Sequence, residues 1–308
     1  VPVNVAEKIG RDLHRIKRHP LHTVKALIQN HFAKAEKGPR FEFFDDLPRV
    51  VSTKRNFDDL LTAPDHVSRK MSDTYYVDSD SVLRTHTSAH QSLLLEQGHR
   101  AFLATGDVYR RDEIDSSHYP IFHQMEGVRI FSFDELPPDM PRAEAVKIVE
   151  ADLQESLEHM VKSVFGNVES RWNEDFFPFT DPSLEMEVMF EGDWLEILGS
   201  GVMQQKIIQN AIPGEEGNQL GWAFGLGLER LAMILFGIPD IRLFWSEDER
   251  FIEQFEEGVI TRFKPYSKYP PCLKDMAFWC PEDFHENDLF EVVRDVAGDL
   301  VEKVDLID

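Results

Sequence analysis

The chain has 308 residues, 42% hydrophobic and 29% charged, which is enough for one large domain or two ordinary ones with a sizeable core. Its 33 basic and 56 acidic residues give a net charge of −23, which argues against general affinity for DNA, because that affinity needs cations on phosphates. No apolar run approaches the roughly 20 residues of a membrane span, and two cysteines suit a reducing compartment.

Hydrophobic periodicity predicts two long amphipathic helices, at residues 20–34 and 141–165. Alternating patterns predict strands at 101–111 and 119–131, joined by a polar connection, and a hairpin over 183–202. Residues 221–237 indicate a strand, a glycine turn and a helix. Because no βαβ alternation is present, we expect an α+β fold in which helices flank a mainly antiparallel sheet.

The texture of the chain changes after residue 262. A linker rich in proline and lysine leads to an expected strand near 276–279 and then to a helix. One face of this helix carries the apolar residues Leu289, Val292, Val293, Val296 and Leu300. One strand and one helix cannot bury a core alone, so we expect a first domain at 1–262 and half of a second at 263–308.

The stretch "GDVYRRDEIDSSHYPIFHQMEG", residues 106–127, is rich in hydrogen-bonding groups. Side chains repeat every two residues in a strand, so Phe122, Gln124 and Glu126 share one face. An aromatic, an amide and a carboxylate in a row suit a flat ligand and an amine, and Arg110 could bind a phosphate with two hydrogen bonds. The alternative is a salt-bridged face exposed to solvent.

Two further stretches carry candidate binding residues. In "AFGLGLERLAMI", Gly225 and Gly227 allow a ligand close to the backbone, and Arg230 in the first helical turn would meet a phosphate chain. In "FFPFTDPS", Phe177 and Phe179 lie on one side of an extended chain, ready to pack on a third ring. Ordinary packing is the alternative for both.

The stretch "LRTHTSAHQ" has two histidines at the i, i+4 spacing of a helical zinc site. In the H-E-x-x-H motif a glutamate follows the first histidine, whereas Thr87 follows His86 here. The sequence therefore disfavours a zinc site at His86 and His90.

Taken together and in this order, these stretches and "LEILGSGVM" resemble the catalytic domain of class II phenylalanyl-tRNA synthetases of the single-chain, organellar type. "NFDDLLTAPDH", "DTYYV" and "IPDIRLFW" add to the resemblance, which covers residues 18–308. It implies a class II synthetase catalytic domain, with an antiparallel sheet of six to seven strands flanked by helices, at 1–262. Residues 263–308 resemble a linker and the first strand and helix of a ferredoxin-like anticodon-binding domain, which therefore looks truncated.

The resemblance implies an ATP-dependent, AMP-forming ligase that activates phenylalanine as phenylalanyl-adenylate and transfers it to tRNA(Phe), with ATP and Mg²⁺ as cofactors. In-line attack of a carboxylate on the α-phosphorus needs positioning and charge neutralisation rather than an enzyme nucleophile. The resemblance also implies a monomer of the mitochondrial matrix that binds no membrane and no DNA, although no transit peptide is visible. Because residues 282–308 carry ten acids and two bases, we expect weak tRNA charging beside intact adenylate formation.

The resemblance also assigns roles residue by residue. Arg110 and Arg230 are the catalytic arginines, on the α-phosphate and at the far end of ATP. The residues implied at ATP are Arg110, Asp112, His118, Phe122, Gly225, Gly227 and Arg230, with Phe122 and Arg230 on either side of adenine. Those implied at phenylalanine are His86, Ser88, Arg110, Gln124, Glu126, Phe177, Phe179 and Ala223. Glu196 is the candidate Mg²⁺ ligand.

Three alternatives stay open on the sequence. A synthetase-like paralogue would bind nucleotide or amino acid without charging tRNA. The catalytic subunit of a multi-subunit synthetase would share the same motifs. A zinc hydrolase would use His86 and His90.

Overall fold

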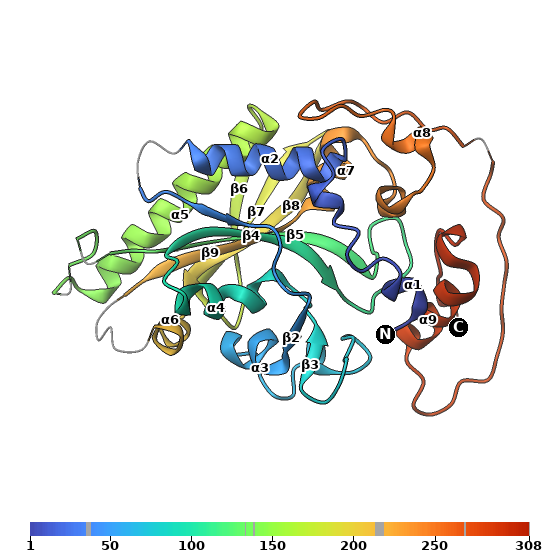
Figure 1. Ribbon diagram of the computed structural model, residues 1–308, viewed down its shortest axis with the longest axis horizontal. Coiled ribbons are helices and arrows are strands. Elements are labelled where there is room, and N and C mark those ends of the chain that lie inside the picture. The colour runs from blue at the N-terminus through green and yellow to red at the C-terminus, as the bar shows by residue number, and fades with distance from the viewer. Residues whose placement is uncertain (35–37, 133, 138, 213–218, 268, 308) are drawn as a thin grey trace.

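The computed structural model describes residues 1–34, 38–132, 134–137, 139–212, 219–267 and 269–307. Its centre is a seven-stranded sheet with helices on both faces (Figure 1). In sheet order the strands are β1 (Glu42–Phe44), β4 (Ala101–Tyr109), β5 (Ile121–Ile130), β9 (Gly221–Gly227), β8 (Asp193–Met203), β7 (Thr180–Phe190) and β6 (Ser170–Asp175). Only β1 and β4 pair in parallel, so the predicted α+β fold with a mainly antiparallel sheet is confirmed.

Three helices cover one face of the sheet, which is uppermost in Figure 1 and is here called the back face: α2 (Pro20–Ala33), α5 (Arg142–Phe165) and α7 (Leu228–Phe236). The apolar stripe of α2 is fully buried at Leu21, Val24 and Ile28. Burying each such side chain stabilises the fold by about 1.5–3 kcal/mol. Both long helices begin and end within one residue of their predicted bounds.

Shorter elements cover part of the front face. There α4 (Gln91–Glu96) and α6 (Gln205–Ala211) pack leucines and isoleucines on Ala104, Val128 and Ala223, and η4 (Thr87–His90) directly precedes α4. The remaining short elements are α1 (Val3–Ala6), η1 (Leu13–Arg15), β2 (Val50–Ser52), α3 (Thr53–Asn56), η2 (Asp58–Leu60), η3 (Val67–Arg69), β3 (Ser81–Leu83), η5 (Ile241–Trp245) and α8 (Glu249–Ile252). None of the described helices is long and apolar enough to cross a membrane.

Two local expectations are wrong. Gly225 and Gly227 do not form a turn, because β9 continues through Gly227 and α7 begins at Leu228. His86 precedes the 3-10 turn with an extended backbone, so it does not share a helical turn with His90. The hydrogen bonds between β5 and β9 continue up to Gly227, so the strand ends directly before the first residue of α7.

The C-terminal segment also differs from expectation. Residues 276–279 belong to no strand and pair with no other described strand. The helix α9 (Glu286–Ala297), followed by η6 (Gly298–Leu300), buries Phe290 and Arg294, whereas Val292 and Val296 of its apolar face are 58% and 83% exposed. The polar face of α9 packs against a loop, whose charged side chains and main-chain carbonyl groups bind it. Within 263–308, Lys268 and Asp308 lie outside the described residues.

The loop that binds α9 consists of residues 111–120. These residues join β4 to β5 and are here called the β4–β5 loop. Arg111 contacts Asp288 and Glu291 of α9, each at 2.6 Å. Arg294 donates from Nη1 to the Asp112 carbonyl at 2.7 Å and from Nη2 to the next carbonyl. The α9 helix and the N-terminal α1 lie together beside this loop (Figure 1).

Candidate active site

On the front face of the sheet, Gln124 and Glu126 of β5 lie beside Gly227 and Gly225 of β9, and this surface is here called the glycine strip. Strand pairing sets Gln124 between Gly106 and Gly227, and sets Glu126 between Ala104 and Gly225. A Cβ added at Gly225 or Gly227 would meet nothing within 4 Å. The same register confirms that Phe122, Gln124 and Glu126 share a face, and it leaves open space beside the amide and the carboxylate.

Glu126 is a buried carboxylate with one unused oxygen. Its side chain is 1% exposed, Gln91 donates to Oε1, and Oε2 has no partner among the described residues. Burial raises the pKa of Glu126 to about 7, whereas the hydrogen bond from Gln91 and the nearby Ser88 hydroxyl, which makes no hydrogen bond to Oε2, act to lower it. A buried acceptor without a donor costs about 1–3 kcal/mol, so this oxygen suits a ligand that brings an N–H group.

Gln91 was missed from the sequence. It follows His90 in the stretch that contains His86 and Ser88, but it meets Glu126 across 35 residues. Only its place beside those two candidates could have suggested a role.

Arg110 stands where β4 ends, on the same side as Phe122. Its Nε donates to the Thr85 carbonyl at 2.8 Å, and its Cζ lies 5.1 Å from the centroid of the Phe122 ring. Burial lowers the pKa of Arg110, and Asp112 works in the opposite direction. Burial and the nearby guanidinium lower the pKa of His86 to about 3, so at neutral pH this imidazole is uncharged beside the cation.

Arg230 lies in the first turn of α7, as predicted. Its Nη1 donates to the main-chain oxygen of Glu196 at 3.0 Å and lies 3.6 Å from a carboxylate oxygen of the same residue. Both side chains are about half exposed, so the ion pair contributes little to stability and can exchange for a ligand.

Asp112 and His118 both belong to the β4–β5 loop. The Asp112 carboxylate accepts from the main chain of Glu113, while His118 Nδ1 lies 2.8 Å from Asp115. Partial burial opposes protonation of His118, but the hydrogen bond with Asp115 raises its pKa overall. Glu113, Asp115 and His118 are the one group of three metal-ligand side chains close together in the described part of the chain, and Glu196 is not among them.

The two predicted phenylalanines form a stacked pair. The rings of Phe177 and Phe179 are nearly parallel, 10° apart, with centroids at 5.7 Å. Phe177 covers Gly199, where a Cβ would lie 2.7 Å from the ring, and Phe179 packs on the cluster that contains Ala223. The pair thus borders the apolar end of the glycine strip, as two rings on one side of an extended chain.

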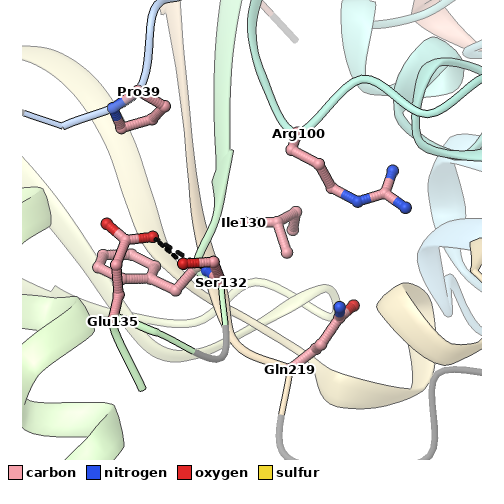
Figure 2. A pocket seen from close by; sticks show the side chains of 7 residues that line it. Pro39, Arg100, Ile130, Ser132, Glu135 and Gln219 are labelled. Atoms are coloured by element: carbon pink, nitrogen blue, oxygen red, sulfur yellow. Dashed lines mark hydrogen bonds between the residues drawn. The ribbon is translucent and has the colours of Figure 1, made fainter. Parts of the chain in front are cut away.

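A separate hollow of about 490 Å³ lies where Ile130 ends β5 (Figure 2). It is lined by Pro39, Arg100, Ile130, Phe131, Ser132, Glu135 and Gln219. Ser132 donates to Glu135 at its rim, and none of the predicted site residues lines it. The hollow is therefore distinct from the glycine strip.

The fold and this site define a class II aminoacyl-tRNA synthetase. The class II core domain (F) of tRNA synthetases matches residues 2–255. A pyrrolysyl-tRNA synthetase from Desulfitobacterium hafniense shares the fold, with a TM-score of 0.55 at 15% identity over 83% of this chain and 80% of that one.

Curated relatives identify the family within this class. A chloroplastic/mitochondrial phenylalanine--tRNA ligase of Arabidopsis thaliana is 54% identical over all of this chain and 71% of its own length. The mitochondrial enzyme of Mus musculus is 50% identical over 99% of this chain and 73% of its own. The alpha subunit from Moorella thermoacetica is 36% identical over 80% and 71%. The chain belongs to the phenylalanine--tRNA ligase family.

Proposed function

We propose that the glycine strip is the site where this phenylalanine--tRNA ligase forms phenylalanyl-adenylate from phenylalanine and ATP before transfer to tRNA(Phe). The observation that carries the proposal is the unpartnered Oε2 of buried Glu126, beside two glycines that leave open space. An α-ammonium group supplies the missing donors, and the Phe177–Phe179 pair offers an apolar end for its ring.

In this proposal the amino acid is held at two ends. Glu126 and Gln124 bind its ammonium group, with Ser88 and His86 at the edge. Its ring lies against the phenylalanine pair and Ala223, where a small buried side chain leaves room.

ATP is proposed to lie across Gly225 and Gly227. Phe122 and Arg230 flank the purine, and Asp112 and His118 approach from the β4–β5 loop. Arg110 neutralises the α-phosphate while the phenylalanine carboxylate attacks it and pyrophosphate leaves. No side chain acts as a nucleophile, so the residues contribute orientation and charge.

Glu196 suits one position of a Mg²⁺ site, because Mg²⁺ usually takes one or two carboxylates together with substrate phosphates. Its carboxylate is half exposed and is held only by the loose contact with Arg230. The ion would neutralise phosphate charge. We further propose that the chain acts as a monomer in the mitochondrial matrix; the names of the organellar relatives support the mitochondrial part of this proposal.

The test is phenylalanine-dependent exchange of labelled pyrophosphate into ATP by the 308-residue chain, with tyrosine and no amino acid as controls. We expect exchange with phenylalanine and little with tyrosine. Binding of both ligands without exchange would favour a paralogue that does not activate amino acids.

A further inference from the structure

Behind Phe122, on the opposite face of β5, His123 is fully buried and bound to Glu229. Glu229 lies in the first turn of α7 and is 3% exposed. Its Oε2 accepts the main-chain N–H of His123 and its Oε1 accepts from Nδ1, both at 2.7 Å. Because a carboxylate oxygen accepts, the imidazole proton is on Nδ1.

The imidazole has little freedom to move. Trp245 stacks on His123 with centroids 5.7 Å apart and planes 24° apart, and His14 lies 5.1 Å away. Two hydrogen bonds on one carboxylate fix both the separation and the rotation of the parts they join. The start of α7 is therefore held rigidly against β5 at this point.

The same point joins the two arms of the proposed purine site. Phe122 precedes His123 in the chain, and Arg230 follows Glu229. The strand β9 pairs with β5 only from Gln124 onward, so the carboxylate continues the contact one residue beyond the ladder. A change here would shift Arg230 relative to the Phe122 ring.

We propose that His123 and Glu229 are a positioning pair that sets the spacing between Phe122 and Arg230 and thereby the affinity for ATP. This proposal rests on the proposed function, in which those two side chains flank the purine. Neither member of the pair touches substrate. None of the residues proposed at phenylalanine lies in α7, so a shift of this helix changes the position of Arg230 and acts on the nucleotide side of the site.

The experiment measures KM for ATP and KM for phenylalanine in the pyrophosphate exchange assay with the full chain. Glu229→Gln places an NH₂ group opposite one of the two donors, and we expect it to raise KM for ATP about tenfold with KM for phenylalanine within twofold. His123→Asn keeps a side-chain N–H near the position of Nδ1, whereas His123→Leu does not. We expect His123→Asn to recover most of the ATP affinity that His123→Leu loses.

Asp152→Asn is the matched control. This carboxylate of α5 accepts from Arg129 and from Trp222 Nε1 at 2.7 Å, behind the same sheet but away from the site. We expect both KM values to stay unchanged in it, even where thermal unfolding shifts as much as in Glu229→Gln.

Phe122→Ala and Arg230→Ala separate the two proposals. If they raise KM for ATP but Glu229→Gln does not, the positioning pair is wrong. If they leave KM for ATP unchanged, the proposed place of the purine is wrong instead. Should Glu229→Gln fail to fold, equal KM values for ATP in His123→Asn and His123→Leu would overturn the pair.

Discussion

The helices behind the sheet and the C-terminal helix α9 are held by opposite faces. Behind the sheet, α2 buries Leu21, Val24 and Ile28 completely. At the β4–β5 loop, α9 buries Arg294 and leaves Val296 83% exposed. Both helices have a clear apolar stripe, but α2 buries its stripe against the sheet, whereas α9 buries Phe290 and Arg294 and leaves Val292 and Val296 of its stripe exposed.

The difference teaches that periodicity reports the polarity of a face and not what covers it. The sheet offers alternating apolar side chains, and burial of apolar area drives α2 onto it. The β4–β5 loop offers carbonyls and Arg111, so the polar face of α9 binds there by hydrogen bonds and ion pairs. Polar contacts of this kind are weaker and more readily exchanged than a buried stripe.

The largest expected effect is a difference between variants of two neighbouring arginines, which lie where the sheet meets the β4–β5 loop. Arg110 projects into the proposed site, whereas Arg111 binds α9. We expect Arg110→Ala to lower kcat/KM for pyrophosphate exchange by about 10²–10³, because one preorganised charge on the reacting group is lost. Arg111→Ala should stay within a few-fold of the parent chain. Similar losses in both variants would mean that the loop as a whole, not Arg110, carries the chemistry.

The sequence predicted most of the sheet and the helices behind it, and little of how α9 is held. The alternation in β5 placed Phe122 and Glu126 on one face, because a strand repeats every two residues wherever it pairs. The contact of Gln91 with Glu126 could not be read from a pattern, since it joins distant segments. The buried face of α9 could not be predicted from its apolar stripe, because the partner of a helix is a property of the tertiary structure.

Glu126 gives the next effect, through pH. Its pKa of about 7 in the folded chain lies above the ordinary carboxylate value, so the stability it contributes is present at low pH and is lost as pH rises through 7. An ammonium ligand requires the carboxylate form, so KM for phenylalanine should fall about tenfold from pH 6 to pH 8. Glu126→Gln should raise KM for phenylalanine and make it independent of pH over this range. A wild-type profile that is flat over this range would contradict the role.

Two glycine substitutions test the strip at a smaller scale. Gly225→Ala adds a Cβ that meets nothing within 4 Å, so the free energy of unfolding should change by less than about 1 kcal/mol, while KM for ATP rises several-fold. Gly199→Ala instead brings a Cβ to 2.7 Å from Phe177, so it should displace that ring and raise KM for phenylalanine. Unchanged kinetics in Gly225→Ala would mean that no ligand approaches the backbone there.

The smallest expected effect concerns how α9 is held. Arg294→Met removes the donors to the carbonyls of Asp112 and Glu113, at about 0.5–1.5 kcal/mol for each hydrogen bond. We expect faster hydrogen exchange across α9 and at most a threefold change in pyrophosphate exchange, because Arg110 and Glu126 take their positions from the sheet. Val296→Ser is the matched control on the exposed face and should alter neither. If Val296→Ser releases the helix and Arg294→Met does not, an apolar contact holds α9 after all, and the two regions follow one rule.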